Sequence, residues 1–381
     1  EGLVDYVDLD CGLEPQQFHH GMPTNFSARQ FYRPFVEKVR SAAGSVPVLS
    51  VLGSIGDLDE AEAALADGVI DMAGAARQLI AEPRFVQNGR TGTEHLSRTC
   101  IRCNWCTAAG SEGAQGCTIN PVAYRERIWD AIAPAPLPRR VVVIGGGPGG
   151  MEAARVAALR GHDVTLIESG EELGGALALW ARLPGRENYG TAIGWWAREL
   201  DRMGVTVKLG TRADAALVLG MAPDAVIVAT GARYSRGGRS ITHDADMPGH
   251  HLLHVLRPEE VLQGDALPTG RVLLFDGEGY HASSGIAEML AKAGAEVTYV
   301  TAGFTPLSQR VADSFEGRLV VQRMKLAGVR FMPTTWVRAI GAEAVTVYDV
   351  HTGAERSEVA DAVILATGRE PVDGLARALE G

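Results

Sequence analysis

The 381-residue chain carries a formal net charge of −10, and 46% of its residues are hydrophobic against 22% charged. A chain of this length exceeds one ordinary core, so we expect two or three α/β domains. The acidic balance and the lack of a basic, aromatic-rich window exclude a nucleic-acid partner. No run approaches 18 apolar residues and no basic, apolar leader opens the sequence, which predicts a cytoplasmic protein without a membrane span or signal peptide.

Strand and helix patterns alternate in the first part of the chain. Strands are predicted near Val4–Leu9, Val46–Leu52 and Val69–Ala73, with helices near Ser27–Ala43 and Leu58–Ala66 between them. This alternation predicts a parallel sheet. Because three such units cannot close a barrel and the sequence starts within a strand without a methionine, we expect a piece of a longer protein.

Four of the five cysteines form the pattern C-x2-C-x2-C-x10-C, at Cys100, Cys103, Cys106 and Cys117. Three thiolates on one tight loop with a fourth on a returning segment are typical of an iron–sulfur cluster. Structural zinc, which prefers two separated pairs of ligands, and unligated thiols are the alternatives. Only Cys11 stands apart.

Three prolines within Ala131–Pro138 predict a stiff linker and a domain boundary. We expect the last βα units of a larger domain at 1–95 and a cysteine loop with linker at 96–138. A first nucleotide-binding domain is expected at 139–268, completed by 360–381, and a second, degenerate one at 269–359.

The apolar strand Val141–Ile144 runs into a glycine-rich loop G-x-G-x-x-G, which a helical stretch and a second strand follow. This order is typical of a Rossmann-like domain, in which a helix N-terminus and free N–H groups meet a pyrophosphate. Glu168 ends the second strand and is expected to accept hydrogen bonds from ribose hydroxyls. This predicts FAD, ADP or NAD and argues against NADP. The candidate nucleotide-binding residues of the loop are Gly145, Gly147, Pro148, Gly149 and Gly150.

Small residues mark two further turns in this domain. Gly174 and Gly175 predict a tight turn near the same ligand, with a plain loop as the alternative. Ala229, Thr230 and Gly231 follow an apolar strand, where small side chains let a strand end approach a cofactor.

The second nucleotide-binding pattern, after the strand Val272–Phe275, has a broken fingerprint. Asp276, Glu278 and His281 occupy its three glycine positions. Two carboxylates would face a pyrophosphate, and the next strand ends at Thr301 with neither an acid for a ribose nor a nearby arginine for a 2′-phosphate. We interpret this domain as structural, with a working NAD(P) site as the alternative.

Together these features resemble the iron–sulfur branch of the old yellow enzyme superfamily, which includes trimethylamine dehydrogenase and 2,4-dienoyl-CoA reductase. The amine dehydrogenases are the closer likeness, through Ala229–Arg233, Ile241–Asp244 and Arg257–Val261. The resemblance spans essentially the whole chain. It implies an α/β protein with the C-terminal part of an FMN-binding TIM (β/α)8 barrel, a 4Fe-4S cluster and two Rossmann-like domains of the glutathione-reductase type.

The resemblance also implies flavin contacts at the barrel end. Its last strand ends, which hold the flavin phosphate, correspond to Gly53, Ser54, Gly74, Ala75, Ala76 and Arg77. Arg77 is the expected phosphate clamp, with a surface ion pair as the alternative. Ser54 stands where relatives commonly carry arginine.

Two histidines are the candidate catalytic residues. His19 and His20 lie in a polar loop at the expected barrel mouth, where substrate contact or proton transfer competes with a solvated loop as the interpretation. Gln17 and Gly110 stand where the resemblance implies an aromatic cage for trimethylamine. We therefore expect a different amine, larger or carboxylated.

The implied activity is amine oxidation by hydride transfer to FMN, with electrons leaving through the cluster to an electron-transfer flavoprotein. An NAD(P)H-dependent 2,4-dienoyl-CoA or enoate reductase is the alternative. An electron-transfer subunit or inactive fragment is a third hypothesis. We also expect a homodimer.

Overall fold

The computed structural model describes residues 3–10, 22–108, 115–129, 131–264, 266–308, 311–312 and 314–380. The chain divides into two compact units. The first contains Glu1–Ala131 with Asp313–Glu316, and the second contains Ile132–Ala312 with Gly317–Gly381.

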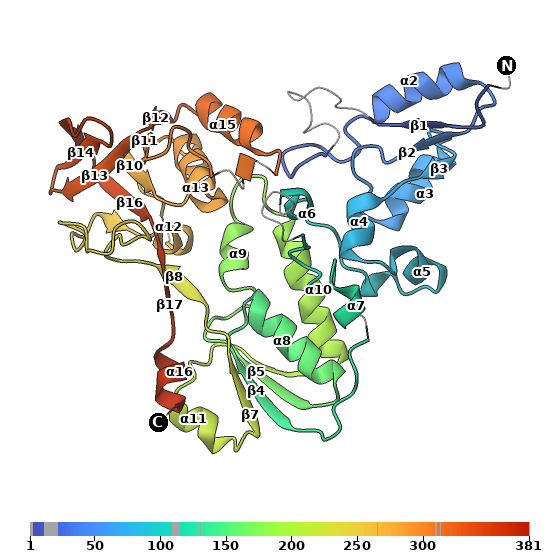
Figure 1. Ribbon diagram of the computed structural model, residues 1–381, viewed down its shortest axis with the longest axis horizontal. Helices are drawn as coiled ribbons and strands as arrows, with labels where there is room; N and C mark the ends of the chain where they lie inside the picture. The colour runs from blue at the N-terminus through green and yellow to red at the C-terminus, as the bar shows by residue number, and fades with distance from the viewer. Residues whose placement is uncertain are drawn as a thin grey trace. The chain divides into compact units, whose positions relative to one another are not determined.

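A parallel sheet with the strand order β1-β2-β3 opens the first unit. Val7 pairs with Val48 and Leu49 pairs with Met72, which confirms the predicted parallel arrangement. The first helix begins later than predicted because Pro34 favours the first turn of a helix. The bounds are β1 (Val7–Leu9), α2 (Arg33–Ala43), β2 (Val48–Ser50), α3 (Leu58–Ala66) and β3 (Met72–Ala73) (Figure 1).

The core of this unit lies between the sheet and its two helices. Val36 of α2, Val48 of β2 and Ala64 of α3 are fully buried in one cluster. The start of α3 is fixed by Asp57, whose carboxylate accepts the N–H of Glu60 at 2.8 Å. Shorter helices follow: α4 (Ala76–Ala81), α5 (Phe85–Arg90), η2 (Glu94–Leu96), α6 (Trp105–Ala108) and α7 (Glu126–Trp129).

The second unit opens with a parallel sheet in the order β6-β5-β4-β7. The central strand β4 (Arg140–Ile144) confirms the predicted apolar strand and is buried from its second residue onward. Helix α8 (Pro148–Leu159) packs against β4, β5 and α10 (Tyr189–Arg202). The other elements of this sheet are β5 (Asp163–Ile167), α9 (Ala176–Trp180), β6 (Thr206–Lys208), α11 (Ala215–Gly220) and β7 (Ala225–Val228).

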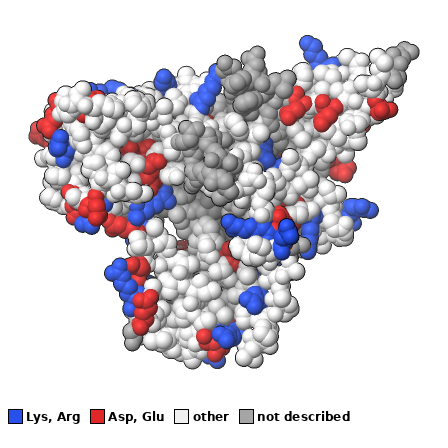
Figure 2. Space-filling view, viewed as in Figure 1, with Lys and Arg blue, Asp and Glu red and all other residues white. Residues whose placement is uncertain are grey.

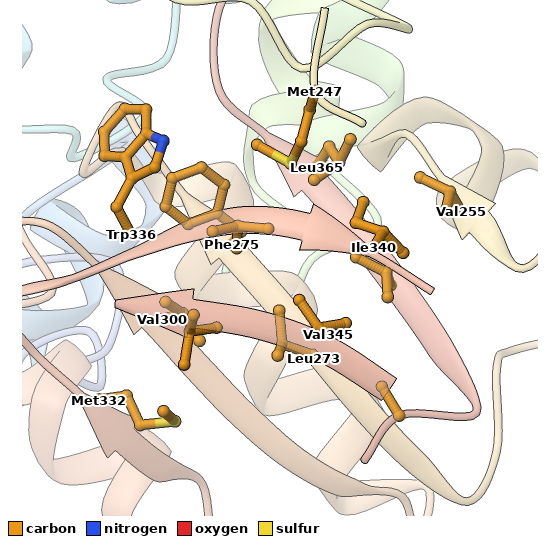
Figure 3. Close-up of a cluster of buried hydrophobic side chains, with 14 residues drawn as sticks. Met247, Val255, Leu273, Phe275, Val300, Met332, Trp336, Ile340, Val345 and Leu365 are labelled. Atoms are coloured by element: carbon orange, nitrogen blue, oxygen red, sulfur yellow. The ribbon is translucent and has the colours of Figure 1, made fainter. Parts of the chain in front are cut away.

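A five-stranded parallel sheet in the order β12-β11-β10-β16-β9 forms the rest of the second unit, with an antiparallel sheet β13-β14-β15 beside it. Phe275 of β10 and Val347 of β14 lie in one buried cluster that joins the two sheets (Figure 3). The bounds are β9 (Val255–Leu256), α12 (Pro258–Gln263), β10 (Arg271–Asp276), α13 (His281–Lys292), β11 (Glu296–Thr301), α15 (Gly317–Leu326), β12 (Arg330–Met332), β13 (Thr335–Ile340), β14 (Ala344–Asp349), β15 (Glu355–Val359) and β16 (Ala362–Ala366).

The end of the chain differs from the expectation that 360–381 completes the first nucleotide-binding domain. Strand β16 pairs with β10 and β9 in the five-stranded sheet. All five of its residues are buried, which requires a central position in a sheet covered on both faces. The last helix, α16 (Gly374–Leu379), does reach the first sheet, where Leu375 and Leu379 pack with Val142 of β4.

A two-stranded antiparallel ribbon joins the segments that follow β7 and β16. β8 (Ala232–Tyr234) pairs with β17 (Arg369–Pro371), so that Arg369 lies opposite Tyr234. The ribbon therefore connects the carboxyl ends of strands from the two parallel sheets.

Charges of both signs are interspersed on the face shown in Figure 2, between wide uncharged areas. Within the described part of the chain, no helix combines the length and the apolar character needed to cross a bilayer.

The cluster of Figure 3 gives a stability prediction. Phe275 is fully buried and its ring meets Trp336 edge-to-face with centroids 4.8 Å apart. We expect Phe275→Ala to lower the free energy of unfolding by about 3–5 kcal/mol, because it removes buried apolar surface and leaves a cavity. Urea unfolding followed by tryptophan fluorescence measures this. The fully exposed Leu253 provides the control, since Leu253→Ala should change stability by less than about 0.5 kcal/mol.

Candidate functional site

The four cysteines of the predicted cluster line one pocket in the first unit. None of them forms a disulfide. Three isoleucines supply the apolar wall of the pocket. Cys106 lies in α6, whereas Cys100, Cys103 and Cys117 lie on irregular backbone. The structure thus brings together all four sulfurs that the sequence singled out.

The loop between the first three cysteines is tightened by two left-handed residues. Arg102 and Asn104 have φ angles of +52° and +54°. Such angles are uncommon outside glycine, although asparagine tolerates them comparatively well. Both side chains are at least nine-tenths buried.

Hydrogen-bond donors surround the sulfurs. The Thr118 hydroxyl lies 3.2 Å from the sulfur of Cys103. The backbone N–H groups of Ile119 and Asn120 lower the pKa of Cys117, against the effect of burial. Donors of this kind stabilise negative charge on sulfur and tune the potential of a cluster.

Burial controls the protonation of these thiols. It raises the pKa of Cys103 to about 12 and that of Cys106 to about 11, and it also raises the pKa of Cys117. The thiolate form therefore needs a compensating cation, and metal binding at neutral pH would release protons.

The four cysteine sulfurs that line the pocket are a donor set used both by polynuclear clusters and by zinc. Across the residues that the structure describes, no three His, Cys, Asp or Glu side chains converge as ligands of a single ion. Zinc would require its sulfurs about 2.3 Å from one point. A cluster instead places several metal and sulfide atoms between its cysteines.

The predicted flavin-phosphate residues gather at the carboxyl ends of β2 and β3. The Arg77 guanidinium donates to the carbonyls of Pro23 and Gly53 and to the amide oxygen of Asn104. Its described hydrogen-bond acceptors are thus neutral, in contrast to the surface ion pair considered as the alternative. Among the described residues, no carboxylate pairs with the charge of Arg77.

The glycines at these strand ends have structural reasons of their own. A Cβ on Gly53, where φ is +89°, would lie 2.9 Å from the Phe31 ring, and one on Gly74 would lie 2.8 Å from Val51. The neighbouring Ser54, Ala75 and Ala76 are only partly covered or exposed.

Arg102 adds a buried positive charge near Arg77. Burial lowers its pKa, and the like charges of Arg29 and Arg77 lower it further. One amino group donates to the Ser27 carbonyl at 2.9 Å, while its buried Nε has no hydrogen-bond partner among the described residues. Three neighbouring arginines, with one buried donor unused, fit a phosphate group.

The candidate catalytic residues His19 and His20 lie outside the described residues, as do Gln17, Gly110 and Cys11.

The first glycine-rich loop has the geometry of a nucleotide site. Gly145 follows β4 with φ of +108°, and α8 begins at Pro148. A Cβ on Gly150 would lie 1.8 Å from the Gly145 carbonyl oxygen, so only glycine fits there. A Cβ on Gly147 would meet nothing within 4 Å, which leaves its backbone open to a ligand.

Glu168 is hydrogen-bonded to the same loop. Its carboxylate accepts the N–H groups of Gly146 and Gly170, both at 2.6 Å, and the Ser169 hydroxyl at 3.0 Å. Because a carboxylate has about four acceptor positions, capacity remains for ribose hydroxyls.

Two other turns reach this loop. The N–H of Gly174 donates to the Gly146 carbonyl at 2.8 Å, and a Cβ on Gly175 would lie 3.1 Å from the Cα of Gly147. A Cβ on Gly145 would lie 2.3 Å from the Ala229 carbonyl oxygen. The predicted residues at 174–175 and 229 thus surround the fingerprint loop. The following Thr230 and Gly231 bond instead to Val372.

In the second nucleotide-binding pattern, the side chain of Asp276 occupies the N–H groups of the fingerprint loop. Asp276 ends β10 and is 1% exposed. Its carboxylate accepts the N–H of Glu278 at 3.0 Å, the N–H of Gly279 at 3.0 and 3.1 Å, the Ser283 hydroxyl at 2.8 Å and the Tyr299 hydroxyl. The backbone donors that would meet a pyrophosphate are therefore engaged within the chain.

The second acid of this loop is also engaged. Glu278 accepts the Tyr234 hydroxyl at 2.9 Å and a guanidinium N–H of Arg369 at 3.2 Å. Arg369 lies over the rings of Tyr234 and Trp180. This aromatic and ionic group fills the space beside the loop.

The sequence analysis did not single out three residues of these sites: Asn104, Arg102 and Tyr299. Their hydrogen-bond partners lie 23 to 210 residues away along the chain. The only local indication of this was the asparagine at position 104 within the cysteine loop, because asparagine adopts a left-handed backbone more readily than most residues.

Comparison with known proteins agrees with this geometry. Residues 139–380 match the family model described as pyridine nucleotide-disulphide oxidoreductase. The chain is 33% identical over 343 residues to N,N-dimethylglycine/sarcosine dehydrogenase of Chromohalobacter salexigens, covering 88% of this chain and 49% of that protein. It is also 33% identical over 348 residues to bilirubin reductase of Mediterraneibacter gnavus, covering 90% of this chain and 51% of that protein.

Among solved structures, 6-hydroxypseudooxynicotine amine oxidase of Pseudomonas geniculata N1 matches with a TM-score of 0.92 at 34% identity, covering 98% of this chain and 56% of that one. These relatives confirm the predicted resemblance to amine-dehydrogenase-like flavoproteins. The chain spans about half the length of the curated relatives it matches.

Two glycines provide a matched pair of substitutions. We expect Gly150→Ala to abolish nucleotide binding, because its Cβ would overlap the Gly145 carbonyl and displace α8 from β4. Gly190→Ala should retain the nucleotide, since Gly190 lies in α10 outside the fingerprint loop and its Cβ meets no atom of the chain within 4 Å. Adenine nucleotide released by acid from the purified full-length protein measures both. Equal retention in the two variants would contradict the prediction.

The buried acid gives a pH prediction. Burial raises the pKa of Asp276 from 3.8 to about 6, so the folded state binds more protons than the unfolded state between about pH 4 and 6, and stability falls as the pH rises through that window. Asp276→Asn removes this titration. Its stability relative to the wild type should therefore increase by on the order of 3 kcal/mol from pH 4 to pH 7 in urea unfolding.

Asp361 supplies a control of opposite sign. A hydrogen bond from Arg271 lowers its pKa to about 2, so Asp361→Asn should lose stability relative to the wild type as the pH rises from about 2 to about 4, with no further change from pH 4 to pH 7. A pH-independent difference for Asp276→Asn would refute the buried-acid prediction.

Proposed function

Because this chain belongs to the pyridine nucleotide-disulphide oxidoreductase family, we propose that it is part of an FMN- and 4Fe-4S-dependent oxidoreductase that oxidises an amine. The observation that carries the proposal is the pocket lined by Cys100, Cys103, Cys106 and Cys117. The similarity to a dimethylglycine/sarcosine dehydrogenase and to an amine oxidase supports an amine as the substrate.

The flavin site is proposed at the carboxyl ends of β2 and β3, as the last part of a TIM barrel. FMN, when bound, supplies a two-electron acceptor for hydride. Arg77 and Arg102 would hold its phosphate. Arg102 and Arg29 would together supply the positive charge that relatives commonly provide with an arginine at the position of Ser54. Gly53 and Gly74 keep the strand ends free of side chains.

The first Rossmann-like site is proposed to hold FAD or ADP. Gly147 leaves the backbone open toward a pyrophosphate, and Glu168 retains acceptor positions for ribose hydroxyls. The convergence of Gly174, Gly175 and Ala229 on the same loop supports a single nucleotide bound there.

The second nucleotide-binding pattern bears on which acceptor takes the electrons from the reduced flavin. Asp276 occupies the backbone donors that a nicotinamide dinucleotide needs, and Arg369 and Tyr234 hold Glu278 beside them. We therefore propose that reducing equivalents leave through the cluster to an electron-transfer flavoprotein. The alternative is an NAD(P)H-dependent 2,4-dienoyl-CoA or enoate reductase, which the similarity to bilirubin reductase favours.

The test is anaerobic reduction of the full-length protein, followed by flavin and cluster absorbance. We expect secondary or tertiary amines to bleach the flavin, and NADH and NADPH to leave it oxidised, because Asp276 blocks the nicotinamide site. Rapid bleaching by a nicotinamide and none by any amine would establish the reductase instead.

A pair of cysteine variants tests the electron exit in the same assay. Cys103→Ala should lose iron and transfer to a one-electron protein acceptor while retaining flavin reduction by amine. Cys11→Ala, which changes the one cysteine outside the motif, should retain both.

A further inference from the structure

Asn104 has a position that the proposed chemistry does not use. It lies between Cys103 and Trp105 inside the cysteine motif, is 1% exposed, and is not a metal ligand type in this pattern. A buried primary amide is costly unless its donors and acceptor are all paired.

The Asn104 amide joins three distant segments of the first unit. Its Nδ2 donates to the carbonyls of Met22 and Ser314, both at 3.0 Å, and its Oδ1 accepts a guanidinium N–H of Arg77. These partners are 82, 210 and 27 residues away along the chain. Both donors and the acceptor are thereby satisfied.

Arg77 also bonds to the same loop that Asn104 holds, so the hydrogen bonds form a closed network. Arg77 donates to the carbonyl of Pro23, directly after Met22, and to that of Gly53. Asn104 and Arg77 therefore hold consecutive carbonyls of one loop. The same amide that holds this loop also orients the guanidinium.

The third partner, Ser314, belongs to the short buried segment 314–316, called the tip below. Ser314 is 3% exposed and Glu316 is fully buried, and the Asn25 amide donates to Glu316 at 3.5 Å. Asparagine suits this junction because aspartate would present no donor to the Met22 and Ser314 carbonyls, and because asparagine tolerates the left-handed backbone.

We propose that Asn104 is a positioning residue that couples the cysteine loop to the flavin-phosphate end of the barrel, by fixing Arg77 relative to Cys103 and Cys106. This inference rests on the proposed cluster and FMN. Disturbing the amide changes flavin binding through Arg77, although Asn104 itself does not touch the flavin.

A double-mutant cycle on FMN affinity tests this. Reconstitution of flavin-free, cluster-loaded full-length protein gives the dissociation constants of the wild type, Asn104→Gly, Arg77→Ala and the double variant. Glycine keeps the left-handed backbone and removes only the amide. We expect each single substitution to weaken binding by about tenfold or more, and the double variant to be no weaker than Arg77→Ala alone within about twofold.

The matched control is Asn88→Ala. Asn88 is also buried, and its amide donates to the Ser97 hydroxyl at 2.9 Å without contacting Arg77 or the cysteine loop. It should leave FMN affinity within about twofold of the wild type. Multiplying effects in the double variant, or an equal loss in Asn88→Ala, would show a general structural role and overturn the inference.

Amide hydrogen exchange of the wild type provides a second test that needs no variant. Release of FMN should increase exchange in peptides covering 100–108 and 314–316 together. Unchanged exchange in both would overturn the inference. Iron and sulfide analysis of the wild type tests the proposed cluster separately, so that failure of the proposed function is distinguished from failure of the coupling between Asn104 and Arg77.

Discussion

Parallel strand pairing is the constraint on which both parallel sheets of the second unit depend, because it places the carboxyl ends of neighbouring strands at one edge. In the first sheet, the ends of β4, β5 and β7 bring Gly145 against Ala229 and Gly146 against Glu168. In the second sheet the same rule brings the ends of β10 and β11 together. There Asp276 ends β10 beside Thr301 of β11, and its carboxylate accepts the hydroxyl of Tyr299 from within β11. One edge is left open to a ligand, and the other is filled by side chains.

The sequence was sufficient for features encoded locally. The strands β4 and β5, the glycine loop and the cysteine spacing each depend on residues within about 20 positions of one another, and the structure has them where the patterns predicted. The placement of β16 could not be predicted, since its burial depends on pairing with strands about 90 and 108 residues earlier. A short apolar run does not state which sheet it enters.

For the candidate sites, too, the sequence predicted the local motifs but not the contacts between distant segments. Sequence spacing identified Asp276 as out of place in a nucleotide fingerprint, but its hydrogen bonds to Ser283 and Tyr299 required the folded sheet. Likewise, the cysteine motif identified the cluster loop, whereas the contacts of Asn104 with Met22 and Ser314 come only from tertiary structure. The roles of His19 and His20, and the homodimer, stay predictions.

The segment around Ser314 has a consequence for how this protein can be divided. Residues 313–316 belong to the first unit, although the chain on both sides of them belongs to the second. The polypeptide therefore passes between the units three times. A single break at 131/132 would leave the first unit without the carbonyl that Asn104 holds. The two units are thus not interchangeable modules, and a natural or engineered fusion that exchanges one of them must carry this tip with it.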